Sequence, residues 1–290
     1  MSGPAGGELA RRLERLTGAG VSDLRLTGSQ FAYRHCRATL ADGRVVFVKE
    51  AAEDGGAALN AEARGLGWLA ETGTVPVPGV IGWDESTLVI SWVQAGAADA
   101  ASAGRFGRDL ALMHAAGADR FGAPWPGFIA SLPLPNEGTA SDWPGWYARQ
   151  RLLPYLRRAA DAGALGPAHV RPVEAVLARI TELAGPAEPP SRIHGDCWSG
   201  NVLWSGGRGW LIDPAAHGGH RETDLAMLAL FGAPFLDRIL ASYGEAAPLA
   251  AGWRGRVPLH QLHPLLVHAC LFGAGYAGPV AEAARAALAA

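Results

Sequence analysis

The segment IHGDCWSGNVLWSGGRGWLIDP, residues 193–214, decides most of what the sequence indicates about this protein. Its apolar runs VLW and WLI flank the turn-rich stretch SGGRG, a pattern that predicts a β-hairpin centred on Gly207. Strands paired in that register would bring Asn201 and Asp213 face to face at the open end of the hairpin. An amide oxygen and a carboxylate that meet there are ligands suited to Mg²⁺.

Earlier in the same segment, Asp196 precedes Asn201 with the spacing Asp-x-x-x-x-Asn. The catalytic loop of protein kinases has this spacing, and a second metal-binding aspartate follows it. Here His-Gly-Asp stands where those enzymes carry His-Arg-Asp, and Ile-Asp-Pro, with Asp213, stands where they carry Asp-Phe-Gly. The pattern predicts phosphoryl transfer in which Asp196 accepts the proton of a substrate hydroxyl. We expect His194 to hold the loop by hydrogen bonds rather than to act as a base.

The N-terminal part of the chain supplies a candidate cation. Residues 21–50 show strand patterns, and Lys49 lies near the end of the run VVFVK. Residues 59–71 predict a helix whose apolar stripe includes one carboxylate, Glu62. A carboxylate on a core-facing stripe needs a partner, because a buried unpaired charge is costly. We expect Lys49 to be that partner and the pair to position the phosphates of a nucleotide.

A stretch of small residues, AGAADAASAG, follows residue 94 and predicts a boundary between two lobes. We expect a nucleotide-binding lobe at 1–94 and a larger, mostly helical catalytic and substrate lobe at 95–290. In the second lobe, Asp224 begins an apolar helical pattern, either as a helix-start charge or as a tether for the catalytic loop. The predicted fold class is α+β with the two lobes of a protein kinase, and the cleft between them is the expected ligand site. The helical patterns of the second lobe fall at residues 102–115, 146–160, 170–183, 222–231, 259–272 and 280–289.

Composition excludes several classes of protein. The 290 residues carry a net charge of −2, which argues against a basic nucleic-acid-binding surface. The three cysteines are far apart and form no C-x-x-C pair, which argues against a structural zinc site and favours a reducing compartment. We expect no apolar run near the roughly 18 residues of a membrane span and no secretory signal. The expected protein is soluble and cytoplasmic, with no nucleic-acid or membrane partner.

Three stretches together resemble one family. HGDCWSGNVLW, LIDPAAHGGHRETDLAMLALFG and DWPGWYARQRL are similar to segments of the fructosamine kinase (ketosamine-3-kinase) family, and the resemblance runs from Gly28 to Pro279. It implies a protein-kinase-like fold and ATP-dependent phosphorylation of the 3-hydroxyl of a fructosamine or ribulosamine. The phosphorylated product is unstable and frees the amine, so the implied role is the repair of glycated amines and proteins.

On the nucleotide side, the resemblance implies that the backbone of Ser91, Trp92 and Val93 binds adenine. It also implies that a glycine-rich loop covers the phosphates. Here that loop reads LTGSQFAYR, with Gly28 as its only glycine, so backbone amides from Ser29 onward would have to approach the phosphates without glycine's freedom.

On the acceptor side, the resemblance implies that Asp196 accepts the proton, that Asn201 and Asp213 bind Mg²⁺, and that Trp198 and His268 flank the sugar. The substrate is then a small-molecule or protein-bound ketosamine, and the cofactors are ATP and Mg²⁺.

Two alternatives stay open at this point. A related small-molecule kinase acting on an aminoglycoside, a choline-like alcohol or a sugar would share the same catalytic residues. Such enzymes would take acceptor-binding carboxylates from their C-terminal helices, where this sequence has few. A non-catalytic nucleotide-binding protein would usually have lost one of three residues that are all present, namely Lys49, Asp196 and Asp213.

Overall fold

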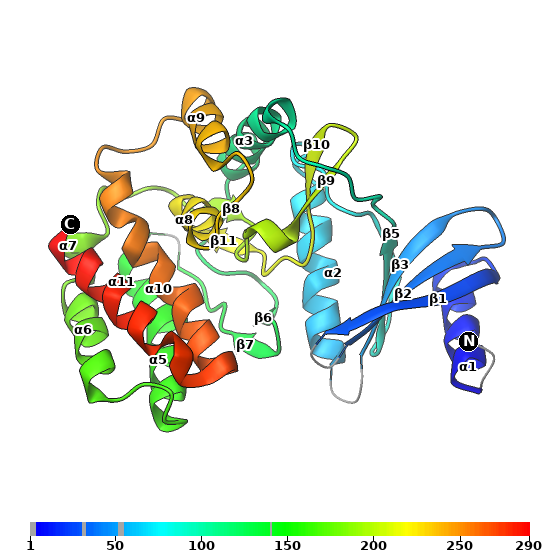
Figure 1. Ribbon diagram of the computed structural model, residues 1–290, viewed down its shortest axis with the longest axis horizontal. Helices are drawn as coiled ribbons and strands as arrows, with labels where there is room; N and C mark the ends of the chain where they lie inside the picture. The colour runs from blue at the N-terminus through cyan, green and yellow to red at the C-terminus, as the bar shows by residue number, and fades with distance from the viewer. Residues whose placement is uncertain (1–3, 31–32, 52–54, 140) are drawn as a thin grey trace.

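A five-stranded antiparallel sheet forms the N-terminal part of the protein in a computed structural model that describes residues 4–30, 33–51, 55–139 and 141–290. The strand order is β1-β2-β3-β5-β4. Figure 1 shows this sheet at one end of the molecule and the bundle of α5, α6, α10 and α11 at the other, with α2 between them. The strands are β1 (Val21–Gln30), β2 (Tyr33–Leu40), β3 (Val45–Ala51), β4 (Val80–Trp83) and β5 (Thr87–Ser91).

The two faces of this sheet pack against different helices. Strand alternation sends Val46 and Val48 of β3 toward α1 (Pro4–Thr17), whose leucines at positions 9 and 13 are fully buried. Burial of each leucine side chain stabilises this contact by roughly 1.5–3 kcal/mol. The opposite face meets α2 (Gly56–Ala70), so Phe47 and Lys49 face the side of the sheet that carries the cavity described below. The two helices thus account for the mixed α+β character of this region.

The remainder of the chain is mostly helical, as predicted. Its first long helix, α3, begins at a capping box in which the Asp99 carboxylate accepts from the Ser102 backbone N–H at 2.7 Å. Two large apolar clusters hold the helices together. The helices are α3 (Ala100–Ala115), α4 (Trp143–Tyr147), α5 (Leu153–Asp161), α6 (Pro167–Ala178), α7 (Ile180–Leu183), α8 (Glu222–Leu230), α9 (Leu236–Ala246), α10 (Trp253–Phe272) and α11 (Ala277–Ala289).

Shorter helical turns and small strands complete this part. A π-helical turn, η1 (Ala148–Leu152), joins α4 to α5, and 3₁₀ turns form η2 (Ser199–Asn201) and η3 (Gly273–Tyr276). Three two-stranded ribbons pair β6 with β7, β8 with β11, and β9 with β10. These strands are β6 (Gly127–Ile129), β7 (Leu132–Leu134), β8 (Ser191–Ile193), β9 (Val202–Ser205), β10 (Arg208–Leu211) and β11 (His217–Gly219).

The predicted hairpin around residue 207 forms, but its register differs from the prediction. Asn201 pairs with Ile212, whose backbone N–H donates to the Asn201 carbonyl at 3.1 Å, so Asn201 and Asp213 are not directly opposite each other. The turn contains only two residues, Gly206 and Gly207, and both have positive φ (56° and 71°). A tight turn of this kind matches strand twist best, and it moves the centre of the hairpin by half a residue.

The expectation that no stretch is long and apolar enough for a membrane span is wrong at one place. By length and composition alone, Trp253–Ala289 qualifies, although 44% of its most apolar window is buried inside the protein. This stretch contains α10 and α11, which join the larger apolar cluster of the helical region, and a positive φ of 80° at Gly273 ends α10. Its apolar residues therefore serve the core, and the stretch is weak evidence for a membrane segment.

Candidate active site

A cavity of about 890 Å³ lies between the N-terminal sheet and the helical region. Phe47 and Ile90 of the sheet line one side, while Val267 of α10 and Phe128 at β6 line another. The cavity gathers candidates that stand far apart in the sequence. Those that line it are Lys49, Glu62, Ser91, Trp92, Val93, Asp196, Trp198, Asn201, Asp213 and His268.

The ammonium of Lys49 lies between two carboxylates. Its Nζ donates to both oxygens of Glu62 at 2.8 Å and to Oδ1 of Asp213 at 2.6 Å. Burial alone would lower the pKa of Lys49, but the two carboxylates outweigh it and hold the pKa above its usual value. Burial also raises the pKa of Glu62, and the charge of Asp213 adds to that effect against the opposing charge of Lys49. The Lys49–Glu62 pair inferred from the helical stripe thus forms in the structure.

Asp213 reaches this position through a strained backbone. Its φ of 53° lies in the left-handed region, which costs a residue with a Cβ roughly 1–2 kcal/mol. The conformation turns the chain away from the line of β10 directly after the hairpin. Strain of this kind is found where a side chain must be aimed at a site.

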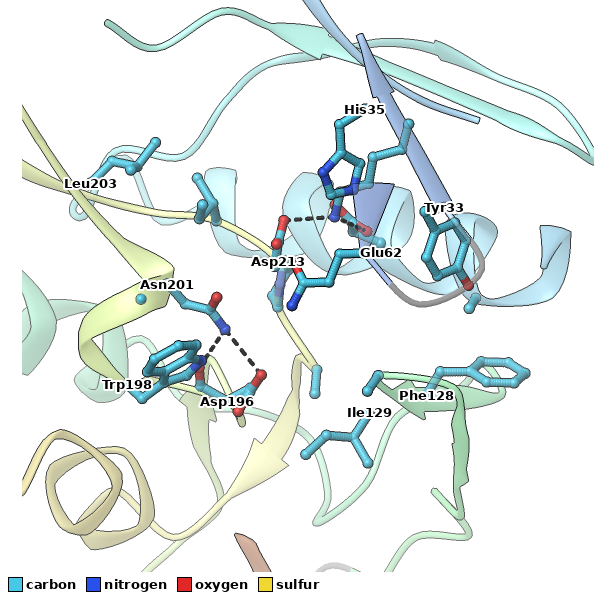
Figure 2. A pocket seen from close by; sticks show the side chains of 18 of the residues that line it. Tyr33, His35, Glu62, Phe128, Ile129, Asp196, Trp198, Asn201, Leu203 and Asp213 are labelled. Atoms are coloured by element: carbon cyan, nitrogen blue, oxygen red, sulfur yellow. Dashed lines mark hydrogen bonds and ion pairs between the residues drawn. The ribbon is translucent and has the colours of Figure 1, made fainter. Parts of the chain in front are cut away.

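Asn201 fixes the orientation of Asp196. The Asn201 Nδ2 donates to the Asp196 carboxylate at 3.0 Å and to the Asp196 carbonyl at 2.9 Å. Burial raises the pKa of Asp196 to about 7, although the hydrogen bond from Asn201 opposes the shift. In Figure 2, Asp213 stands between this pair and Glu62. A carboxylate with a pKa near neutrality is suited to take a proton from a hydroxyl group.

The geometry of Asn201 also bears on metal binding. Because its NH₂ group is committed to Asp196, the amide oxygen is the atom left to act as a ligand, and it has no hydrogen bond within the described part of the chain. Figure 2 shows Asn201 and Asp213 bordering the same space. One amide oxygen and one carboxylate form a donor set that fits a hard divalent cation bound beside phosphates.

Asp224 anchors the backbone of the catalytic loop, which confirms the second of the two roles suggested by the sequence. Its carboxylate accepts from the backbone N–H groups of His194 at 2.7 Å and Gly195 at 2.9 Å. Nε2 of His114 lies 3.1 Å from the same carboxylate. Gly195 has a φ of 80°, and a Cβ there would lie 2.3 Å from the Ala215 carbonyl oxygen. Glycine is therefore required between the histidine and the aspartate of the His-Gly-Asp motif.

His194 acts as the structural hydrogen-bonder that the sequence suggested. Its Nε2 donates to the Ile212 carbonyl at 2.9 Å, which links the catalytic loop to the strand that leads into Asp213. The ring is fully buried, and burial lowers its pKa despite the nearby Asp224. His194 therefore stays neutral and joins the two segments that carry the acidic residues.

The segment that follows β5 offers fewer backbone donors for adenine than the resemblance implies. The Ser91 N–H donates to the Gly79 carbonyl at 2.9 Å, and the Trp92 N–H donates to the Val45 carbonyl at 3.2 Å. The N–H of Val93 has no protein acceptor among the described residues. Of the three backbone donors, Val93 is the one free to bind a nucleotide base.

The predicted phosphate-covering loop borders the cavity with only some of its described residues. Gly28 and Ser29 lie near the exposed end of β1 and do not line the cavity, whereas Gln30 does. A Cβ at Gly28 would meet open space, so the one glycine of this loop is not required by crowding. Phe31, which the loop also includes, lies outside the described residues. The phosphate contacts of this loop stay a prediction.

Several residues of the cavity had no sequence signal. His35 of β2 lines it near Lys49, and the rings of Phe231, Phe272 and Tyr276 line it near Trp198 and His268, whereas Tyr33, which also lines it, belongs to the predicted loop LTGSQFAYR. The aromatic residues come from α10 and from segments that follow α8 and α10, so their convergence depends on how these helices pack. Alternation along β2 could have placed the side chain of His35 on the face opposite the buried Cys36.

A second group of titratable residues lies in the core rather than in the cavity. The ligand atoms of His220, Glu222 and His260 lie within 4.8 Å of one another. Arg256 already donates to both oxygens of Glu222, at 2.6 and 2.9 Å, so this carboxylate is balanced by a permanent cation. Burial alone would raise the pKa of Glu222, but the facing His260 and Arg256 side chains bring it to about 2. This group has the character of a structural ion pair.

The fold and the site together define a kinase-like phosphotransferase. An aminoglycoside phosphotransferase solved with ADP and hygromycin B shares the fold at 16% identity, with a TM-score of 0.65 over 96% of this chain and 98% of the other. The fructosamine kinase family model matches residues 25–290, and the chain belongs to that family.

Several relatives agree with this assignment. A fructosamine-3-kinase homologue of Thermobifida fusca has a solved structure with 54% identity and a TM-score of 0.94, over 97% of this chain and 99% of the other. A "probable ketoamine kinase" of Thermus thermophilus is 37% identical over 81% of this chain and 84% of its own length. The chloroplastic protein-ribulosamine 3-kinase of Arabidopsis thaliana is 31% identical over 81% of this chain and 73% of its own length. The chain is therefore a phosphotransferase of the ketosamine kinase type.

Proposed function

We propose that this protein transfers the γ-phosphoryl group of ATP to the 3-hydroxyl of a ketosamine, a fructosamine or a ribulosamine. One observation carries the proposal: a single cavity brings together the Lys49–Glu62 pair, the carboxylate of Asp213 and the Asp196–Asn201 pair. Phosphoryl transfer needs positioning and charge neutralisation more than covalent chemistry, and these five groups supply both.

The nucleotide would bind on the side of the sheet. Val93 N–H would donate to the adenine ring, and the ammonium of Lys49 would contact the α- and β-phosphates while Glu62 keeps it in place. Mg²⁺ would be held by Asp213 and the amide oxygen of Asn201, where it would neutralise charge on the β- and γ-phosphates. The Asp213 carboxylate that would hold Mg²⁺ also forms an ion pair with Lys49, so the metal and the ammonium would share it.

The acceptor would bind on the side of the helical region. Asp196 would accept the proton of the 3-hydroxyl as the oxygen attacks phosphorus, and the sugar would lie beside Trp198 and His268. The ketosamine 3-phosphate then decomposes and frees the amine, so the biological result would be deglycation. We further place the enzyme in the cytoplasm, because the three cysteines Cys36, Cys197 and Cys270 are free thiols suited to a reducing compartment.

A direct experiment measures ADP release with a synthetic fructosamine against the same amine unglycated. We expect ADP release only with the fructosamine, and a phosphorus NMR signal that assigns the ester to the 3-hydroxyl. A different small-molecule kinase would instead release ADP with an aminoglycoside, an amino alcohol or a free sugar and would release none with fructosamines.

A further inference from the structure

A continuous row of aromatic rings leads from the catalytic loop to the mouth of the cavity. We call Trp198, Phe231, His268, Phe272 and Tyr276 the aromatic shelf, and all five line the cavity. Ring centroids are 5.9 Å apart for Trp198 and Phe231, and 5.1 Å apart for Phe231 and His268. The row continues from His268 to Phe272 at 5.4 Å and to Tyr276 at 4.9 Å. The shelf thus starts two residues after Asp196 and extends outward from it.

Two rings of the shelf are exposed. Phe272 is 55% and Phe231 is 38% exposed, whereas most large apolar side chains of this protein are buried. Exposed rings that adjoin each other on the wall of a functional cavity mark a place where an apolar group binds. The shelf has room for such a group, because the rings border the cavity instead of closing it.

The shelf also lacks formal charge. Among the described residues that line the cavity, the charged ones are Lys49, Glu62, Asp196 and Asp213, and all four belong to the catalytic cluster. The lining contributed by α8 and α10 consists of apolar side chains apart from His268: Met227, Pro264, Val267, Leu271 and Phe272. A second cationic group on the substrate would therefore find no carboxylate to offset the loss of its hydration.

His268 gives the shelf one defined polar atom. Its Nδ1 lies 2.7 Å from the Pro264 carbonyl, which can only accept, so Nδ1 carries the proton. Burial lowers the pKa of His268, so the ring is neutral at pH 7 and its Nε2 is an acceptor. An acceptor at this point suits one N–H group, such as that of the protonated amine in a ketosamine.

We propose that the aromatic shelf binds the amine portion of the ketosamine and selects amines with an apolar or aromatic substituent. This inference rests on the proposed function. With the sugar at Asp196, the ketosamine nitrogen donates to His268, and its substituent lies against Phe231, Phe272 and Tyr276. Amines that carry a second positive charge bind poorly.

A matched series of substrates tests the proposal on the wild-type protein. Fructosamines of methylamine, benzylamine, pentylamine and 1,4-diaminobutane differ only in the substituent, and the last two have nearly the same length. We expect kcat/KM for the benzyl and pentyl compounds to exceed that for the 4-aminobutyl compound by about tenfold, mainly through KM. Equal values across the series, or a preference for the 4-aminobutyl compound through cation–π attraction, would overturn the proposal.

Variants of two rings at the end of the shelf give a second readout. In Phe272→Ala and in Tyr276→Ala, the ratio of kcat/KM for the benzyl compound to that for the methyl compound should fall about 3- to 10-fold, the range expected for loss of an aromatic contact. Phe272→Glu should shift the preference from the pentyl to the 4-aminobutyl compound by at least the same factor. Leu112→Ala, at a residue that is 54% exposed and outside the cavity lining, serves as the control with unchanged ratios.

The outcomes separate this inference from the proposed function. The protein could phosphorylate the methyl compound while neither the substituent nor Phe272→Glu changes kcat/KM. That result would exclude a role of the shelf in amine binding and leave the ketosamine kinase assignment in place. No phosphorylation of any fructosamine by the wild-type protein would overturn both.

Discussion

Two clusters of paired charges in this protein both join carboxylates to cations, but they differ in how far the negative charge is balanced. In the core, Glu222 pairs with Arg256, and Glu188 pairs with Arg221. Each carboxylate there has its own guanidinium. In the cavity, a single lysine serves two carboxylates, and Asp196 adds a third without a cation of its own.

Charge balance and neighbouring open space distinguish a functional site from a structural ion pair. In the core cluster, Arg256 of α10 balances the charge of Glu222 on α8, so this pair holds the two helices together. The cavity cluster keeps excess negative charge and borders about 890 Å³ of open space. Excess charge next to such a space favours a bound cation together with a phosphate-bearing substrate.

The largest expected effect is on turnover. Replacement Asp196→Asn removes the proton acceptor and should lower kcat by about 10²- to 10⁴-fold, the usual contribution of a positioned general base. Nucleotide affinity, measured by calorimetry, should change little, because Lys49 and Val93 stay in place. Asp119→Asn, at an exposed aspartate away from the cavity, is the control. Wild-type turnover in Asp196→Asn would rule out the assigned role.

The core cluster should respond in stability instead. Arg256→Met leaves the buried Glu222 without its cation and should lower the free energy of unfolding by about 3–5 kcal/mol. Urea denaturation measures this loss, and kcat per folded molecule should be retained. Arg254→Met, at an exposed position on the same helix, should cost far less. A large loss of kcat in folded Arg256→Met would mean that the core cluster takes part in catalysis.

A smaller effect on activity is expected for Glu62→Gln. Without the negative charge of Glu62, Lys49 keeps only its ion pair with Asp213, which holds the ammonium away from the phosphates. We therefore expect kcat/KM for ATP to fall about 10- to 100-fold. Steady-state kinetics at varied ATP concentration measure the change. The matched control is Glu50→Gln on β3, next to Lys49 in the chain, where Glu50 pairs with Arg34 outside the cavity. Equal effects of both replacements would contradict a special role for Glu62.

A change of one pH unit is expected to have a smaller effect than these replacements. Because the pKa of Asp196 is raised from 3.8 to about 7, its basic form is lost as the pH falls below 7. We expect kcat/KM to fall about tenfold per pH unit below 7 and to reach a plateau above it. The residual activity of Asp196→Asn should not show this limb. A wild-type profile that is flat from pH 5 to 8 would mean that Asp196 does not titrate in this range.

The same shift predicts a change in stability of opposite sign. A carboxyl group whose pKa is higher in the folded state opposes folding once it is ionised, and this cost develops as the pH rises from about 4 to about 7. Relative to Asp196→Asn, the wild-type protein should therefore lose stability over that interval. Urea unfolding of both proteins at pH 5 and pH 8 measures the difference, and a difference independent of pH would refute the assignment.

Local patterns in the sequence were sufficient for most of the elements and for the class of enzyme. Period and turn signals located the strands within residues 21–50, most helices and the hairpin near residue 207, because these depend on neighbours in the chain. The fixed spacing of Asp196 and Asn201 indicated a kinase-type catalytic loop. The position of Glu62 on an apolar helical stripe indicated a carboxylate that needs a cationic partner. The same reasoning paired Glu62 with Lys49 across 13 residues.

The tertiary structure decided what depends on contacts between distant segments. A two-residue turn shifted the hairpin so that Asn201 pairs with Ile212. Backbone bonding uses the N–H groups of Ser91 and Trp92, whereas that of Val93 has no protein acceptor in the described part of the chain. The apolar stretch over α10 and α11 proved to pack into the core. The aromatic shelf combines rings from three separate segments, and side chains so far apart in sequence meet only through the packing of helices, which no local pattern specifies.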